Sequence, residues 1–218
     1  MRGWLDGLKS PLRQASDEDL ARRLQRDGGG PAMAELMQRW DRRIFRLCYR
    51  MVADEHHAED LVQETFLRIF RYRLTFRHQS SFGTYVRRIA VNVCLDWRRR
   101  RKVRHEKSIQ ESSGDSDMAR PELKDEQTPE PMDVLQQCER ARAVRVALDE
   151  LPDTMRAIAV MRHYEKLKLR EIAQILEMPL GTVKTTMSRA LVRLGESLQA
   201  AGHGPPAGSV IHIDEVSS

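Results

Sequence analysis

The most constraining part of the sequence is residues 167–198, LKLREIAQILEMPLGTVKTTMSRALVRLGESL, where two apolar stripes flank a helix-breaking segment. The first stripe lies between Leu169 and Leu176 and the second between Val183 and Leu198, both at the three-to-four-residue spacing of an amphipathic helix. Pro179 cannot continue the first helix but can open the second. Two helices joined by a tight, glycine-bearing turn predict a helix-turn-helix.

The outer face of the second of these helices allows two interpretations. Between its apolar positions this helix carries five polar or basic residues on the other face, Lys184, Thr185, Ser188, Arg189 and Arg193. Such side chains at the N-terminal end of a recognition helix can contact base edges and phosphates in the major groove. The alternative is an ordinary helical hairpin with a solvated outer face. The pattern favours the DNA-binding interpretation.

Helical periodicity also runs through the rest of the chain. It predicts a first helical domain over residues 16–107, whose last helix ends in the basic run Arg98–Lys102, and a second of four helices over residues 134–198. Between them, residues 108–133 carry eight acids and two bases, a local charge of −6, and three prolines. That composition is typical of a flexible linker. The predicted fold class is all-α: two small helical domains joined by a flexible acidic linker, the second containing the helix-turn-helix.

The two ends of the chain give weaker signals. Residues 1–15 show no clear periodicity and are expected to be a loose N-terminal arm. Residues 199–218 are rich in glycine and proline and are expected to be a disordered tail. The apolar patch at residues 210–213 leaves open whether this tail is idle or adds a strand to a partner.

Charge and motif content narrow the functional class. The net charge of +5 favours an acidic partner such as nucleic acid. The chain has neither the apolar run of a membrane span nor a signal-peptide core, so we expect a cytoplasmic protein without membrane insertion. Cys48, Cys94 and Cys138 lie far apart and are expected to be buried thiols, with a zinc site or a disulfide as the alternative.

An enzyme interpretation finds little support in the sequence. Phosphate-binding, hydrolase and zinc-protease motifs are missing, and the densest titratable cluster is His56-His57 beside two acids. Adjacent histidines on a helix diverge by about 100°, which does not suit a shared metal. We therefore expect no catalytic residues, metal, cofactor or small-molecule substrate.

Three stretches together resemble a known family. They are AEDLVQETFLRIFR (58–71), SFGTYVRRIAVNVCLDWRRRR (81–101) and LPDTMRAIAVMRHYEKLKLREIAQILEMPLGTVKTTMSRALVRL (151–194). In this order they resemble the small two-domain bacterial sigma factors of the extracytoplasmic-function type. The resemblance implies a protein that binds core RNA polymerase, directs it to specific promoters and assists promoter melting. The alternative is a free-standing helix-turn-helix regulator that binds duplex DNA without polymerase.

The resemblance also implies roles for individual residues. The polymerase-binding surface would comprise Glu59, Asp60, Leu61, Gln63 and Glu64, although acids on a helix face are also typical of a merely solvated surface. The loop and helix that capture an unstacked base of the minus-ten element would comprise Phe76, Arg77, Ser80, Tyr85 and Asn92. Tyr85 stands where the family usually has tryptophan, and Asn92 could instead make a structural hydrogen bond.

Two further sets of DNA contacts follow from the resemblance. Arg98, Arg99, Arg100 and Arg101 would lie against promoter phosphates, an interaction that provides affinity without sequence information. Thr182, Lys184, Thr185, Ser188 and Arg189 would read the minus-thirty-five element. Many relatives are also held inactive by an anti-sigma factor, so such a protein is a further candidate partner.

Overall fold

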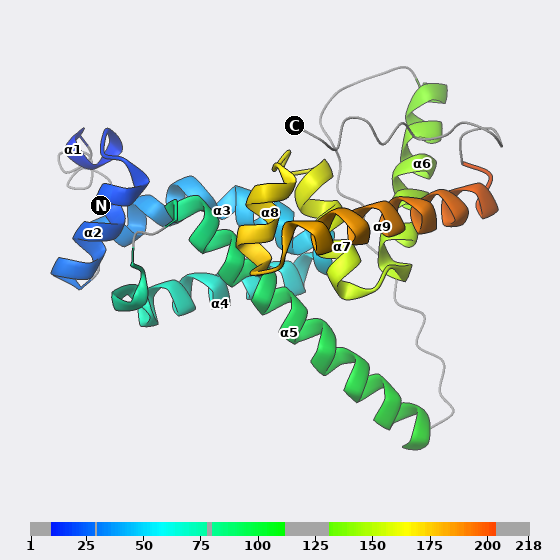
Figure 1. Ribbon diagram of the computed structural model, residues 1–218, viewed down its shortest axis with the longest axis horizontal. Helices are drawn as coiled ribbons and strands as arrows, with labels where there is room; N and C mark the ends of the chain where they lie inside the picture. The colour runs from blue at the N-terminus through cyan, green and yellow to red at the C-terminus, as the bar shows by residue number, and fades with distance from the viewer. Residues whose placement is uncertain (1–9, 29, 78–79, 112–130, 204–218) are drawn as a thin grey trace.

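The structure is a computed structural model that describes residues 10–28, 30–77, 80–111 and 131–203, with only the backbone path at 10–11, 105–111 and 131–138. Its first part comprises α1 (Ser10–Arg13), α2 (Asp17–Asp27), α3 (Pro31–Val52), α4 (Glu55–Arg71), the 3-10 helix η1 (Arg73–Thr75) and α5 (Phe82–Glu111) (Figure 1). Its second part comprises α6 (Pro131–Glu150), α7 (Asp153–His163), α8 (Leu169–Leu176) and α9 (Leu180–Ala200). The predicted all-α, two-domain fold is confirmed. The predictions for residues 1–9, 112–130 and 204–218 lie outside the described residues.

Local capping sets the helix boundaries in the first domain. Ser16 caps α2 by accepting a hydrogen bond from the Asp19 backbone N–H at 3.1 Å, and Asp54 caps α4 by accepting from His57 N–H at 2.8 Å. Gly28, in the left-handed conformation at φ 72°, ends α2. The helices differ from the prediction at three places: α1 lies in the stretch expected to be a loose arm, and α5 continues to Glu111 and α6 begins at Pro131, both inside the segment expected to be linker.

Helix α3 is the centre of the first domain, in contact with α2, α4 and α5. Its buried stripe includes Leu36, Trp40, Ile44 and Leu47. The three-to-four-residue spacing of apolar side chains in α3 and α4 also predicts that Met37 and Phe70 are buried. This prediction is wrong, because they are 41% and 40% exposed.

Helix α7 is the centre of the second domain and is surrounded by neighbouring helices. Every residue from Arg156 to Met161 is buried, because α7 contacts α8 and α9 on one side and α3 and α5 on the other. The turn of the helix-turn-helix differs from the expected one. Its left-handed residue is Glu177 at φ 54°, and Gly181 lies inside α9.

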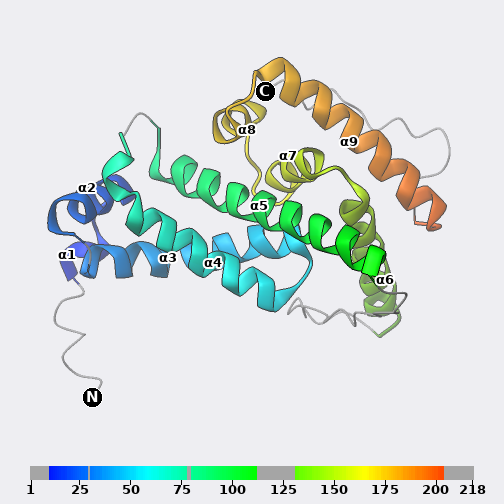
Figure 2. The same cartoon turned by 90° about the horizontal axis from the view of Figure 1, so that it is seen from below.

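The two domains pack directly against each other, which the sequence did not predict. Helix α5 lies between α4 on one side and α7 and α8 on the other (Figure 2). Helix α3 also contacts α6 and α7. The buried apolar residues of both domains form one contiguous cluster. The described part of the chain is therefore a single docked body.

Two helical glycines should respond in opposite ways to alanine. A Cβ added at Gly83 would lie 2.9 Å from Cη2 of the packed Trp40 indole, whereas one at Gly195 has no neighbour within 4 Å. We expect Gly83→Ala to lower the free energy of unfolding by about 1–3 kcal/mol through overpacking. Gly195→Ala should raise it by about 0.5–1 kcal/mol, because alanine loses less entropy in a helix. Chemical denaturation measures both, and shifts in the same direction would contradict this packing.

Candidate nucleic-acid and partner interfaces

The start of α9 presents one polar face to solvent. Thr182, Lys184, Thr185 and Arg189 are exposed and Ser188 is half-buried. The buried residues of this part of α9, Val183, Met187 and Ala190, lie on its other face. The structure therefore brings all five predicted recognition-helix residues together on one accessible face.

Within that face the short side chains are held against their own helix. The Thr185 hydroxyl lies 3.1 Å from the Gly181 carbonyl and 3.0 Å from that of Thr182, and the Ser188 hydroxyl donates to the Lys184 carbonyl at 3.2 Å. The long side chains of Lys184 and Arg189 are thus the ones that can reach farthest from the helix. That combination suits a helix that lies deep in a groove.

An aromatic cluster fixes both ends of the loop that precedes α5. Phe76, at the start of the loop, and Phe82, at its end, have their rings edge to face at 6.0 Å between centroids. Phe82 also meets the Trp40 ring edge to face at 6.1 Å, and Tyr85 packs on Phe76 at 4.6 Å. Phe76 is buried. Its ring therefore anchors the loop and is not presented to solvent.

The other minus-ten candidates lie nearer the surface. Arg77 and Asn92 are exposed, and Ser80 and Tyr85 are half-buried. The Tyr85 hydroxyl lies 3.4 Å from the Tyr72 carbonyl, and burial raises the pKa of Tyr85. Tyr85 and Asn92 are seven residues apart and so share one face of α5.

Helix α2 braces this loop through two side chains that sequence reasoning missed. The Gln25 amide donates to the carbonyls of Arg73 and Phe76 at 2.9 and 2.8 Å, and Glu18 accepts from the Phe82 backbone N–H at 3.1 Å. The two contacts hold opposite ends of the loop. The sequence contains only a weak signal of these loop contacts, namely polar residues beside the buried Leu20 and Leu24. Helix periodicity does not show what a polar side chain contacts.

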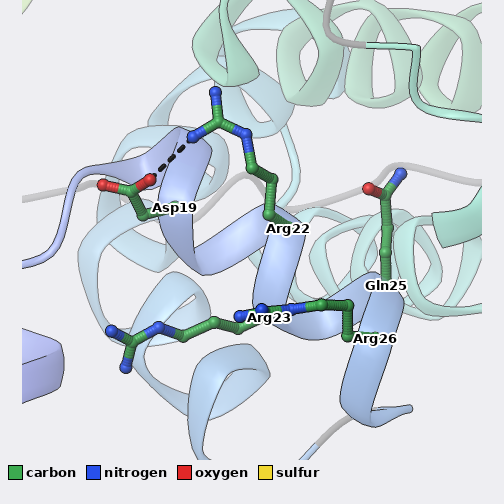
Figure 3. Close-up of a pocket in the computed structure, with 5 residues that line it drawn as sticks. All are labelled: Asp19, Arg22, Arg23, Gln25 and Arg26. Atoms are coloured by element: carbon green, nitrogen blue, oxygen red, sulfur yellow. Dashed lines mark hydrogen bonds and ion pairs between the residues drawn. The ribbon is translucent and has the colours of Figure 1, made fainter.

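Gln25 also lines a surface hollow of about 540 Å³ on α2, together with Asp19, Arg22, Arg23 and Arg26 (Figure 3). Arg22 and Asp19 form an exposed ion pair at 2.7 Å, which offsets part of the positive charge there. Exposed pairs of this kind contribute little to stability. The hollow is an open, charged part of the surface.

The basic run at residues 98–101 does not have a uniform environment. Arg99, Arg100 and Arg101 are exposed, whereas the Arg98 side chain is only 11% exposed. Arg98 donates to Asp153 at 2.5 Å and to Asp149 at 3.3 Å. The structure therefore separates Arg98 from the three arginines that follow it.

The carboxylates of Asp149 and Asp153 lie among three cations from both domains. Arg156, which is 1% exposed, donates to Asp149 at 2.7 Å, and Lys102 donates to Asp153 at 3.3 Å. Burial alone raises the pKa of Asp149, but Arg156 and Arg98 outweigh it and hold the pKa below its ordinary value. For Asp153, burial is likewise outweighed by Arg98 and then Lys102, so that its pKa is also lowered. Both carboxylates are therefore ionised at neutral pH and compensate the buried arginine charge.

A second set of contacts joins α5 to the helix-turn-helix region. Arg87 donates to Glu165 at 3.1 Å, with both side chains largely buried. Arg88 donates to the Glu177 carboxylate and to the Gln174 carbonyl, each at 2.7 Å. The turn before α9 is thus held against α5.

The predicted polymerase-binding surface is only partly on the surface. Glu59, Asp60 and Gln63 are exposed on α4, and Glu64 pairs with Arg68 at 2.7 Å. Leu61 is buried in the core.

Two apolar side chains extend the same exposed side of α4. Leu67 is 61% exposed, and Phe70 also reaches the surface. They follow Gln63 at helical spacing, four and seven residues on. Sequence periodicity missed Phe70 by assigning it to the core.

Metal and membrane sites find no support in the described parts of the chain. No group of three histidine, cysteine or acidic side chains there could hold a metal ion, and no helix there could cross a membrane. Cys48 and Cys94 are buried free thiols, and the hydrogen bond between them together with burial raises the pKa of Cys94. The side chain of Cys138 lies outside the described residues.

Comparison with known proteins covers both domains. Residues 36–104 match the family model Sigma-70 region 2, and residues 141–194 match Sigma-70, region 4. The chain is 31% identical to the ECF RNA polymerase sigma factor SigW of Bacillus subtilis, over 79% of this chain and 91% of that one. It is 31% identical to the RNA polymerase sigma-H factor of Pseudomonas aeruginosa, over 86% and 96%.

Solved structures share the fold. The sigma factor RpoE of Bartonella quintana, in complex with the anti-sigma factor NepR, superposes with a TM-score of 0.59 at 19% identity, covering 76% of this chain and 96% of that chain. CnrH, in complex with the cytosolic domain of CnrY, gives 0.59 at 20% identity, over 85% and 99%. With both regions matched in order and two relatives covered almost end to end, the chain belongs to the ECF family of RNA polymerase sigma factors.

Proposed function

We propose that this sigma factor uses three of the surfaces described above. Helix α4 binds core polymerase, the loop before α5 and α5 itself bind the minus-ten element, and α9 reads the minus-thirty-five element. The observation that carries the proposal is the accessible polar face at the start of α9, opposite a buried apolar face in the same helix. The alternative, an ordinary helical hairpin whose polar face is only solvated, does not explain why this part of the chain matches a sigma-factor region. The match to Sigma-70, region 4 spans this helix.

Reading by α9 would rest on its two long basic side chains. Lys184 and Arg189 are exposed and can donate to guanine edges or phosphates, and a good bidentate contact discriminates by about 1–3 kcal/mol. The hydroxyls of Thr185 and Ser188 are folded back on the helix and leave room for close approach.

Capture of the melted strand would use the side chains on the solvent-exposed side of the aromatic cluster. Because Phe76 is buried, stacking would fall to Tyr85, with Arg77, Ser80 and Asn92 as polar neighbours. Arg99, Arg100 and Arg101 would contact duplex phosphates beyond this site.

Binding to core polymerase would use Glu59, Asp60 and Gln63 on the exposed side of α4. Leu67 and Phe70 extend this surface with apolar area, which is the usual make-up of an interface centre beside a polar rim. Leu61 would support the surface from beneath.

We propose no catalytic role for the chain. We propose that it acts in the cytoplasm, where polymerase and promoters are. The regulator without polymerase is not favoured, because the match to Sigma-70 region 2 would then leave the first domain unused. An anti-sigma factor is a further candidate partner, since the Bartonella quintana relative named above is such a complex.

Run-off transcription with bacterial core polymerase and a promoter pool tests the proposal. Adding the protein should give transcripts that start at discrete sites, and sequencing them should reveal both promoter elements. Binding to duplex DNA without any binding to core polymerase would instead establish the regulator alternative.

Replacing both long side chains of the recognition face should lower promoter use. We expect Lys184→Ala combined with Arg189→Ala to reduce transcription from the selected promoters about ten-fold or more, because two groove contacts are lost. Gln199→Ala, exposed at the far end of α9, is the matched control and should leave transcription unchanged. An equal loss in both variants would place the contacts elsewhere.

Gln25 is proposed as a positioning residue for the minus-ten loop. Gln25→Ala removes both hydrogen bonds to the loop carbonyls, and Gln25→Glu replaces the donor by a carboxylate that cannot donate to them. Each variant should slow strand opening about 5- to 30-fold, as expected for about 1–2 kcal/mol of lost contacts. 2-Aminopurine fluorescence in the minus-ten element measures opening.

The control for Gln25 is Arg26→Ala, an exposed neighbour on the same helix. Binding to core polymerase should stay unchanged in all three variants. A template already unpaired at the minus-ten element should reduce the defect of the Gln25 variants. A defect that is equally large on that template, or loss of core binding, would show that Gln25 has only a general structural role.

A further inference from the structure

We propose that the solvent-facing side of α3 binds the phosphate backbone of duplex DNA. This surface, here called the α3 basic face, comprises Arg42, Arg43, Arg46 and Arg50. The inference goes beyond the proposed function, because these residues belong to none of the surfaces proposed above on α4, α5 and α9. It can therefore fail without affecting the roles proposed for those surfaces.

The four arginines lie on one side of α3. Arg46 follows Arg42 by four residues and Arg43 by three, and Arg50 follows Arg46 by four, so their side chains are neighbours on successive turns. Arg42, Arg43 and Arg46 are exposed and Arg50 is half-buried. The row is about 12 Å long at the rise of an α-helix. Duplex DNA carries one phosphate for about every 1.7 Å of its axis, so several phosphates lie within that length.

The α3 basic face has no carboxylate partner in the described part of the chain. Arg39, one turn before Arg43, differs in this respect, because it pairs with Asp17 at 2.9 Å and with Glu35 at 2.8 Å. Asp41 precedes Arg42 in the sequence, but adjacent residues on a helix diverge by about 100°, so it lies on another side of α3. Guanidinium groups without internal counter-ions attract external anions, and their planar geometry suits phosphate.

Two of these arginines lie over aromatic rings. Arg43 Cζ is 5.3 Å from the centre of the Trp40 ring, and Arg50 Cζ is 4.2 Å from the centre of the Tyr164 ring. A cation–π contact restrains the guanidinium group without using its N–H donors, which remain for phosphate oxygens. Because these side chains are ordered in advance, binding costs less conformational entropy.

The positive charge continues from α3 onto the second domain. Burial, and then repulsion from Lys166 and Arg50, lowers the pKa of His163. Both cations therefore lie close to His163. Lys166 is exposed. The α3 basic face thus has a further cation beside its Arg50 end.

The absence of exposed apolar side chains beside these arginines favours DNA over a protein partner. Helix α3 is described throughout, and the one large apolar side chain exposed on it is Met37, which lies five residues before Arg42 and on another side of the helix. Protein interfaces usually have an apolar centre, whereas interfaces with DNA are polar and strongly positive. Leu67 and Phe70 give α4 the first of these compositions, and the α3 basic face has the second.

Salt-dependent binding to a duplex without promoter elements tests the proposal. The free full-length protein would be titrated into a fluorescein-labelled duplex of about 20 base pairs, at salt concentrations from about 50 mM upwards, with anisotropy as the readout. We expect the combined change of Arg42→Gln, Arg43→Gln and Arg46→Gln to weaken binding at low salt about ten-fold or more. The slope of log K against log salt should become shallower by about two to three, because each lost phosphate contact removes about one.

Two matched variants complete the experiment. Arg26→Gln, Arg140→Gln and Arg142→Gln together remove the same charge from exposed positions on α2 and α6, and the slope should stay nearly unchanged. Replacing the same three α3 arginines with lysine keeps the charge and should keep most of the slope.

Four outcomes would overturn the inference. If the free protein does not bind the duplex at low salt, the α3 basic face is only a solvated surface. An equal loss in the α2–α6 control would show that only net charge matters, and an equal loss in the lysine variant would show a structural defect. Tighter binding of a polyglutamate peptide than of the duplex, abolished by the α3 glutamine variant, would identify an acidic protein as the partner instead.

Discussion

The backbone carbonyl of Met51, at the end of α3, accepts hydrogen bonds from two arginines in different domains, Arg98 at 3.2 Å and Arg156 at 2.9 Å. A helix leaves its last carbonyls without partners inside the helix and carries partial negative charge at that end. Asp149 adds a full negative charge beside both guanidinium groups. This cluster joins α3, α5, α6 and α7, and the packing of one domain on the other depends on it.

The charges of this cluster affect the free energy of burying Arg156. Burying Arg156 at 1% exposure is expensive unless the guanidinium is paired, and burial, then repulsion from Arg98, lowers its pKa. While the domains are docked, Asp149 and the Met51 carbonyl offset this cost. The interface is therefore specific, because the guanidinium groups of Arg98 and Arg156 each have a defined carboxylate partner.

Sequence reasoning recovered the helices because their apolar stripes are regular, and it placed the recognition face of α9 correctly on the surface. It failed where a side chain makes a contact that its residue type and local spacing do not indicate. Arg98 was grouped with the arginines that follow it, although Val91, Cys94 and Arg98 lie on one stripe that enters the interface. That spacing was a usable signal. The partners of Gln25 were not predictable, because contacts between distant segments leave no trace in local periodicity.

The interdomain ion pairs also bear on how the protein behaves among large amounts of unrelated DNA. Glu165, Glu177 and Asp153 occupy, on the arginines of α5, the positions that phosphates could otherwise take. Binding to arbitrary DNA is driven mainly by contacts between cations and phosphates. The docked protein therefore has fewer cationic side chains available for such binding than its 37 lysine and arginine residues suggest. The carboxylates of the second domain thus act as built-in counter-ions for the arginines of α5.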